Sequence, residues 1–193
     1  MTVARNLLTL LAAILIGAAT PGGEFYTVDT AASKLSAKVG FLGIGSKHAG
    51  FPSVSGTVRL DRARPQDIAL DVSIDARALT AGDELTLKRL KGEKFFWVEK
   101  YPTVRFIGRE MALDTPVSGK VTGDLTARGV TRQVTLAVSF DRPPGELKPG
   151  DPVTLTGETR INRYAFGMTS YRLIVGKWVN IQLRARMVPQ PAA

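Results

Sequence analysis

The chain has 193 residues, which is enough for one domain of ordinary size with a sizeable core. It contains no cysteine and one histidine, which excludes disulfides, thiolate nucleophiles and thiolate metal sites and argues against structural zinc or haem. The formal net charge is +9, and no run of five or more basic residues exists. This charge suits a solvated surface, an anionic membrane surface or, less well, nucleic acid.

The first residues have the pattern of a secretion signal. Arg5 precedes the apolar run 7–16, and Gly17-Ala18-Ala19 follows that run. A charged start, an apolar segment too short to span a bilayer and small residues at a cleavage position are typical of a signal peptide. We therefore expect residues 1–19 to be removed, leaving a soluble periplasmic domain of residues 20–193. An uncleaved anchor is the alternative.

Strict alternation of apolar and polar residues predicts β-strands along most of the remaining chain. The clearest case is the hairpin 117–140, in which Gly129 supplies the positive φ that a tight reversal at 127–132 needs. The predicted strands cover residues 32–41, 54–61, 68–75, 103–109, 121–126, 134–140, 153–161 and 179–187.

Three segments lack this alternation and are predicted to be connections. Residues 42–52 are rich in glycine and contain His48, which favours a long loop rather than a strand. Residues 141–152 are dense in proline and glycine, and residues 163–176 are irregular. We expect His48 to be a solvated loop histidine.

A short helix is predicted between the third and fourth strands. Residues 80–83 (TAGD) match the Ser/Thr-x-x-acid pattern of a helix start, and residues 84–91 favour a helix that ends at Gly92. Leu87 and Leu90 share one face of it, and residues 95–97 (FFW) follow. We expect this apolar face to pack against the open end of a barrel.

About eight antiparallel strands with mostly short links predict an all-β barrel, whose interior is filled by side chains or holds one small ligand. Several inward positions carry small residues where Leu or Phe would fill space: Ala37, Gly56, Gly123, Gly157 and Ala185. Either barrel twist and bulges require the glycines, or the small residues leave an elongated apolar cavity. We favour the cavity.

Six motifs spread over the whole mature chain carry a family resemblance. They are 26–29 (YTVD), 51–60 (FPSVSGTVRL), 95–103 (FFWVEKYPT), 123–126 (GDLT), 129–136 (GVTRQVTL), and 161–163 (INR) with 166–168 (FGM). Their order and spacing resemble the YceI-like family of exported bacterial polyisoprenoid-binding proteins. The resemblance implies a lipocalin-like barrel that holds a polyprenyl lipid or quinone tail in its interior and needs no other cofactor.

The sequence departs from the family pattern at four places. The family usually has an acidic residue where Trp97 stands and another where Ala165 stands, an acidic pair where Lys177-Trp178 stands, and a histidine or similar polar residue where Phe41 stands. These departures exchange negative charge for aromatic or basic groups near loops. They therefore bear on the headgroup that a bound lipid would present.

The favoured function is an exported carrier of a long isoprenoid-type lipid. Twelve apolar residues are the candidate ligand-binding residues, with ordinary barrel packing as the alternative for each: Phe41, Val58, Ile74, Phe95, Phe96, Phe106, Leu125, Leu136, Leu155, Phe166, Met168 and Leu183. The other candidate is a membrane-surface or partner-binding barrel without a bound lipid. Its basic candidates lie in or near connections: Arg128, Arg132, Arg163, Arg172 and Lys177.

Catalysis and nucleic-acid binding are disfavoured. The sequence has no nucleophile elbow and no Ser-x-x-Lys motif, and Asp71 and Asp75 fall on a polar strand face. The predicted exposed faces lack aromatic residues flanked by basic ones, which single-stranded nucleic acids would need. We expect neither a catalytic site nor a metal site. The sequence leaves a homodimer open.

Overall fold

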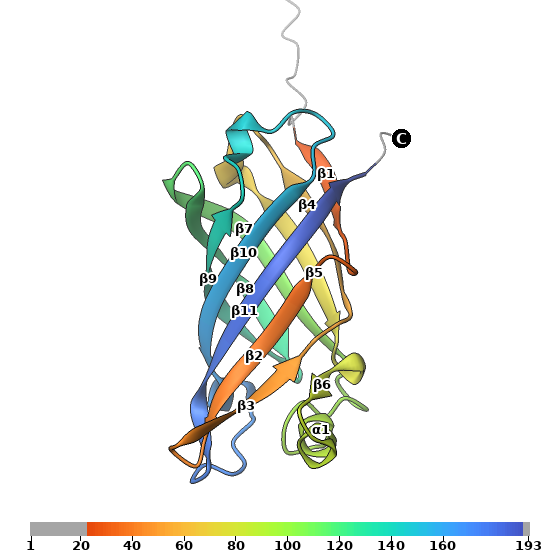
Figure 1. Cartoon of the computed structure of the whole chain (residues 1–193), viewed down its shortest axis with the longest axis vertical. Helices are drawn as coiled ribbons and strands as arrows, with labels where there is room; N and C mark the ends of the chain where they lie inside the picture. Colours follow the sequence, from red (N-terminus) through yellow and green to blue (C-terminus); the bar gives the residue numbers. More distant parts are fainter. Residues whose placement is uncertain (1–22, 191–193) are drawn as a thin grey trace, which may run out of the picture.

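The computed structural model describes residues 23–190. Most of these residues alternate between apolar and polar side chains and form long antiparallel strands (Figure 1). The predicted signal peptide, residues 1–19, lies outside the described residues. The strands are β1 (Glu24–Val28), β2 (Lys34–Phe41), β3 (Gly45–Gly50), β4 (Val54–Leu60), β5 (Ala69–Asp75), β6 (Thr80–Ala81), β7 (Thr103–Thr115), β8 (Ser118–Ala127), β9 (Val130–Phe140), β10 (Val153–Asn162) and β11 (Val175–Pro189). The helical segments are α1 (Glu84–Lys91) and the 3-10 turns η1 (Pro65–Asp67), η2 (Ala76–Ala78), η3 (Pro144–Glu146) and η4 (Arg163–Phe166).

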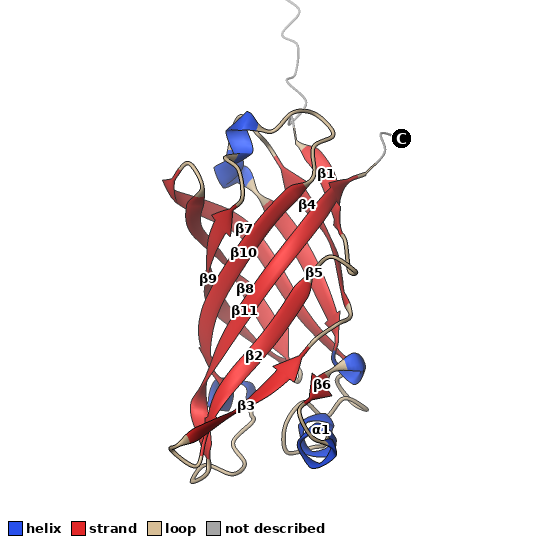
Figure 2. Ribbon diagram, viewed as in Figure 1, coloured by secondary structure: helices blue, strands red, loops and turns tan. Residues whose placement is uncertain are grey.

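Eight of these strands form a closed ring, in the order β1-β4-β5-β7-β8-β9-β10-β11. The ring closes because the end of β11 pairs with β1, with Tyr26 opposite Pro189 and Val28 opposite Met187. The predicted eight-stranded antiparallel barrel with one short helix is therefore confirmed. Figure 2 shows strands along the whole length of the molecule and helical segments only near its two ends.

The two ends of the barrel differ. The end with α1, lowest in Figure 1, is called the α1 end, and the opposite end is called the η3 end. Near the α1 end the wall is extended by β2, which pairs with the first part of β11, then by β3 and the two-residue β6. Connections β2–β3, β5–β7, β8–β9 and β10–β11 lie at the α1 end.

The predicted loop over 42–52 is wrong, because residues 45–50 form β3. This strand pairs with β2 along its whole length, from Phe41 opposite Gly45 to Ser36 opposite Gly50. The sequence GSKHAG shows no apolar alternation because β3 lies near the edge of the sheet and buries only Ala49 fully. A turn over 42–44, with positive φ at Leu42 and Gly43, joins the two strands.

The helix prediction is confirmed over 84–91, with Gly92 at its end, but the residue that caps its start is not the threonine of the TAGD pattern. Asp83 is the N-cap, and its Oδ1 accepts a hydrogen bond of 2.7 Å from the backbone N–H of Thr86. Thr80, the expected cap, instead pairs with Gly50 in the short contact between β6 and β3.

Strands β7 and β11 extend beyond their predicted limits. Each contains a register shift, between Gly108 and Glu110 in β7 and between Val175 and Val179 in β11. An extra residue at a bulge reverses the parity of inward and outward positions. The alternation therefore breaks inside β7 although the pairing continues, whereas the shift in β11 contains two extra residues, so that Val175 and Val179 both face the cavity.

The core consists of two clusters, one at each end of the barrel. At the η3 end, wholly or almost wholly buried side chains close the interior: Tyr26, Leu60, Met111, Phe140, Leu147 and Met187 among them. At the α1 end, a second cluster packs beneath the α1 connection and includes Phe51, Leu79, Val98, Phe166 and Met168. The inward residues midway between the clusters are only partly buried, which leaves room inside the barrel.

Candidate functional site

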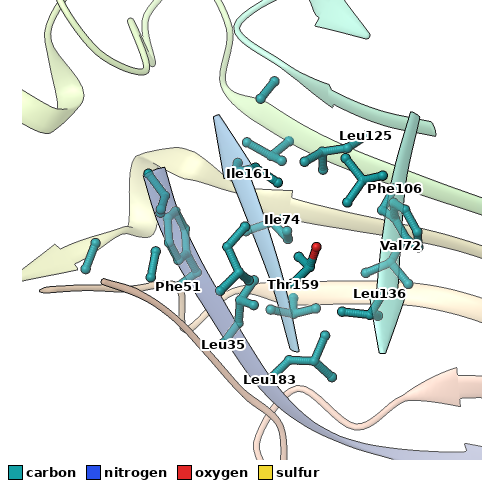
Figure 3. Close-up of a pocket in the computed structure, with 18 of the residues that line it drawn as sticks. Leu35, Phe51, Val72, Ile74, Phe106, Leu125, Leu136, Thr159, Ile161 and Leu183 are labelled. Carbon is teal, nitrogen blue, oxygen red and sulfur yellow. The ribbon is translucent and has the colours of Figure 1, made fainter. Parts of the chain in front are cut away.

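The barrel encloses a cavity of about 270 Å³, close to the lower end of the ~300–1,000 Å³ range typical of small-molecule sites. Its wall is almost entirely apolar, and inward side chains from opposite sides of the barrel converge on it (Figure 3). The hydroxyl of Thr159, the one oxygen visible in that view, donates a hydrogen bond of 2.8 Å to the carbonyl of Thr135. The wall shown in Figure 3 thus suits a hydrocarbon rather than a polar molecule.

Ten of the twelve residues predicted to line the interior lie on the cavity wall. They are Val58, Ile74, Phe95, Phe96, Phe106, Leu125, Leu136, Leu155, Met168 and Leu183. Their contact with a ligand stays a prediction.

The placement of Phe41 and Phe166 on the cavity wall is wrong. Phe41 lies at the last position of β2, and the ammonium of Lys47 stands 5.3 Å from the centre of its ring. Phe166 is only 2% exposed and packs within the cluster at the α1 end, outside the cavity wall. Both side chains are apolar and both belong to the α1 end, but the cavity ends before it reaches them.

Sequence reasoning missed several wall residues. Leu35, Val39 and Ile181 have the same inward parity as their predicted neighbours, and the alternation that found those neighbours also identifies them. Leu90, by contrast, comes from α1, and its place on the wall follows from how the helix packs rather than from strand parity.

The small inward residues have two different causes. Ala37 and Ala185 line the cavity and leave it wider than larger side chains would. Gly56 is required by the backbone, because a Cβ at this position would collide with the carbonyl group of Asp71 on the paired strand. Small residues thus leave space for the cavity at Ala37 and Ala185, and a backbone requirement explains the glycine at Gly56.

The connection 82–101 lies across the α1 end of the cavity, to which it contributes Thr86, Leu90, Phe95 and Phe96. On one side it is held by β3, through an ion pair of 2.8 Å between the Lys47 ammonium and the Asp83 carboxylate. The hydrogen bond from Lys47, followed by those from Thr86, lowers the pKa of Asp83 to about 2.

On the other side the same connection is held by the β8–β9 turn and the β10–β11 connection. The Arg128 guanidinium donates hydrogen bonds to the carbonyls of Glu93 (2.8 Å) and Gly167 (2.7 Å). The rings of Phe95 and Tyr171 stack with their centres 5.9 Å apart. Residues 82–101 are therefore fixed to the barrel at both edges of the cavity end.

Arg163 is a buried arginine on the cavity wall, only 3% exposed. It donates hydrogen bonds to the carbonyls of Gly176 (2.8 Å), Val175 (2.9 Å) and Met168. Among residues 23–190 no carboxylate lies within ion-pair distance of it. Burial lowers the pKa of Arg163, yet a guanidinium stays charged at physiological pH.

The polar candidates for catalysis make other contacts. His48 lies on β3 rather than in a loop, at the border of the cavity and exposed, with its Nε2 3.1 Å from the hydroxyl of Ser46. The hydrogen bond from Arg105 lowers the pKa of Asp71, and that from Arg77 lowers the pKa of Asp75, whereas a general acid or base works best with a pKa near the working pH. Within residues 23–190 no three His, Asp or Glu side chains are grouped closely enough to hold a metal ion.

Within residues 23–190, no helix has the length and hydropathy that a transmembrane segment needs.

Residues 26–187 match the sequence pattern of the YceI-like domain family. This chain belongs to the YceI-like family. A relative, a UPF0312 protein from Pseudomonas putida, is 27% identical over 131 residues, which cover 68% of each chain. A UPF0312 protein from Pseudomonas syringae pv. syringae is 26% identical over 165 residues, covering 82% of this chain and 86% of the relative. The family suggested by the six sequence motifs is therefore confirmed.

Two solved structures have the same fold. BcnA from Burkholderia cenocepacia superposes with a TM-score of 0.73 at 26% identity, covering 82% of this chain and 98% of BcnA. A polyisoprenoid binding domain from Saccharophagus degradans, implicated in plant cell wall breakdown, superposes with a TM-score of 0.65 and covers 86% of this chain and 98% of that domain. At 14% identity the second likeness shows the fold alone.

The four departures from the YceI-like pattern lie at or near the α1 end. Phe41 ends β2, and Trp97, with a positive φ, packs edge-on against Tyr101 in the connection after α1. Ala165 lies in η4 against the buried cluster, and Trp178 is 40% exposed at the start of β11. None of the four residues lies on the cavity wall.

Proposed function

We propose that this protein is an exported carrier or binding protein for a long apolar isoprenoid-type lipid, such as a polyprenyl lipid or a quinone tail, held inside the barrel. The observation that carries the proposal is the apolar cavity enclosed by the closed ring of strands. The structural likeness to a polyisoprenoid binding domain supports it. Export to the periplasm is part of the proposal and rests on the signal-peptide pattern of residues 1–19.

The energetics favour selection by the lipid tail. Burying one methylene contributes about 0.8 kcal/mol, so a five-carbon isoprene unit contributes roughly 3–4 kcal/mol. About eight such units would exceed the practical ceiling of about 18–21 kcal/mol for non-covalent binding. Ordering of the flexible chain must therefore offset much of the gain. We expect affinity to depend on tail length and shape more than on polar contacts.

The first test is to identify what the protein carries. The full chain is expressed in a Gram-negative host and purified from its periplasm, and the bound lipids are extracted for mass spectrometry. We expect a mature chain that begins at Thr20 and an isoprenoid-type lipid in the extract. Recovery of no lipid, together with no binding of added prenyl compounds, would falsify the carrier proposal. A mature chain found in the cytoplasm would contradict export alone.

The second test fills the cavity. Ala37 lies on the cavity wall, whereas Ala137 of β9 points outward and is exposed. Ala37→Phe should reduce prenyl-lipid binding about tenfold or more, because the added ring occupies space that the tail needs. Ala137→Phe makes the same chemical change outside the barrel and should leave binding unchanged. Equal affinities for both variants would place the lipid elsewhere.

A membrane-surface function is the second candidate, favoured by the basic residues of the connections at the α1 end. Arg128, Arg132, Arg172 and Lys177 lie in these connections or at their borders. Binding of the lipid-free protein to anionic vesicles, lost at high salt, is the result expected of such a module. Equal binding to neutral vesicles would contradict it.

A further inference from the structure

Two neighbouring turns at the α1 end expose large apolar side chains. The backbone N–H of Leu42 donates a hydrogen bond of 2.8 Å to the carbonyl of Ile174, so the turn 42–44 lies beside the connection before β11. Leu42 is 55% exposed, Ile44 97% and Leu173 99%. These three residues are called the apolar tip. Single exposed apolar residues are ordinary, but Ile44 and Leu173 contact almost nothing in this chain although they lie on adjacent turns.

The α1 end is basic, whereas the η3 end is slightly acidic. Three segments of the α1 end, two of which carry the apolar tip, contain seven Lys or Arg and no Asp or Glu: 41–48, 128–132 and 160–178. One of these basic residues, Lys47, is paired with Asp83 of the remaining connection. The segments of the η3 end contain four Lys or Arg and six Asp or Glu: 61–67, 113–118 and 141–151. The remaining connection of the α1 end, 76–102, contains six Lys or Arg and four Asp or Glu. The α1 end is therefore the end that an anionic surface attracts.

An exposed aromatic residue, Trp178, follows Leu173 of the apolar tip by five positions along the chain. Trp178, 40% exposed, lies between two cations, with the Arg160 guanidinium carbon 5.0 Å and the Lys177 ammonium 5.4 Å from its ring centre. Tryptophan collects at membrane–water interfaces because its ring is apolar and its N–H is polar. Basic side chains beside it are suited to phosphate headgroups.

The apolar tip also adjoins the cavity. Val39 of β2 and Val175 of β11 line the cavity, and Leu173 is two positions before Val175 along the chain. Phe41, the residue before the turn 42–44, pairs with Val175. Apolar side chains therefore continue from the cavity wall to the outermost turns of the α1 end.

We propose that the apolar tip inserts into an anionic phospholipid membrane, so that the α1 end of the cavity faces the bilayer. Shallow insertion of a few apolar side chains combined with basic residues is a common way for a protein to bind such a surface. The purpose of this docking rests on the proposed function, since a carrier takes up or delivers its lipid at a membrane. The docking itself is testable without any carried lipid.

The absence of cysteine from the chain allows a direct measurement of insertion. Ile44→Cys and Leu173→Cys are each labelled with an environment-sensitive fluorophore, and Leu113→Cys, at the η3 end and 38% exposed in the native chain, is the control. With phosphatidylcholine vesicles that contain phosphatidylglycerol, both tip positions should report an apolar environment and the control should not. The change should be absent with pure phosphatidylcholine, because the basic segments then have no anionic surface to bind.

A paired set of variants separates insertion from loose adhesion. In the double variant Ile44→Ser with Leu173→Ser, the affinity for anionic vesicles should fall by about tenfold or more. Phe25→Ser with Leu113→Ser removes two exposed apolar residues outside the tip and should leave vesicle binding unchanged. Equal loss in both double variants, or a wild-type chain that binds neither kind of vesicle, would overturn the proposal. The second outcome is the one expected if the tip docks to a protein instead.

Failure of docking and failure of the carrier proposal are distinguishable. The three tip residues do not line the cavity, so Ile44→Ser with Leu173→Ser should bind a soluble short-chain prenyl compound as tightly as the wild type does. Normal prenyl binding without vesicle insertion would overturn docking and leave the carrier proposal intact. Vesicle insertion without prenyl binding would do the reverse.

Discussion

Tyr26 is a buried polar residue whose titration makes the stability of the barrel depend on pH. Its side chain is fully buried, and its hydroxyl donates a hydrogen bond of 2.8 Å to Glu24, which also accepts one of 3.1 Å from Arg62. Burial, followed by the bond to Glu24, raises the pKa of Tyr26 from 10.0 to about 12. The folded chain therefore keeps this proton at pH values where the unfolded chain has lost it, and stability falls as the pH rises from 10 to 12.

Tyr26→Phe tests this linkage. Between pH 10 and pH 12 the wild type should lose roughly 2–3 kcal/mol more unfolding free energy than the variant, because phenylalanine has no proton to release. Urea unfolding at several alkaline pH values measures the difference, and a spectrophotometric titration should lack the phenolate step near pH 12 in the variant. Parallel alkaline profiles for the two proteins would contradict the assignment.

Arg163 is the second buried polar group with a clear consequence. Its three bonds to main-chain carbonyls tie η4 to the start of β11. Arg163→Lys keeps the charge but cannot reach three separate carbonyls, so it should lower the unfolding free energy by about 2–4 kcal/mol. Arg172→Lys, at an exposed position in the same connection, should change it by less than about 0.5 kcal/mol. Chemical denaturation measures both variants, and equal effects would count against a structural role for Arg163.

At the scale of elements, α1 is stabilised by two interactions of one residue, Asp83. Asp83 caps the helix and pairs with Lys47 of β3. Because its pKa is lowered from 3.8 to about 2, its stabilising effect is present above pH 3.8 and is lost as the pH falls through about 2.

Asp83→Ala should therefore raise amide hydrogen exchange over residues 84–91 severalfold at neutral pH, measured by mass spectrometry. Asp83→Asn keeps a cap acceptor and removes the charge, so its exchange should fall between those of the wild type and Asp83→Ala. Unchanged exchange in Asp83→Ala would show that packing alone holds the helix.

The elements that sequence reasoning identified are those with regular side-chain parity. The alternation of apolar residues predicts the hairpin of β8 and β9. The helix-forming residues 84–91, followed by Gly92, predict α1. β3 was missed because a strand near the sheet edge that buries little has no apolar pattern to read. The extra length of β7 was missed because a bulge shifts the parity inside the strand. The first residues of β11 were missed because three exposed residues in a row, 176–178, interrupt the alternation.

At the scale of the whole molecule, the sequence identified inward positions more reliably than the space between them. Parity placed Phe106, Leu136 and Leu183 inside the barrel, where they line the cavity. The size of the remaining space depends on strand tilt and stagger, which no single segment encodes. The extent of the cavity toward Phe41 and Phe166 depends in the same way on how the α1 end is packed.

Met187 tests the closure of the ring. It is 4% exposed, lies opposite Val28 of β1 and Val153 of β10, and belongs to the cluster at the η3 end. Met187→Ala should lower the unfolding free energy by about 2–5 kcal/mol. Val188→Ala, one position later on the other face of the strand, should have a smaller effect. Thermal or urea unfolding compares the two, and a reversed order would contradict the role of Met187 in closure.

The pairing of β1 with β11 also sets the order in which this protein can fold. The contact that completes the ring joins residues near the two ends of the described chain, Tyr26 and Pro189. Contacts between residues so distant in sequence form slowly, because a long loop must close before they gain anything. A growing polypeptide that lacks β11 leaves β1 without one neighbour and β10 with an open edge. We therefore expect folding to be late and slow. Late folding fits the proposed export, because a secretion channel admits only an unfolded chain.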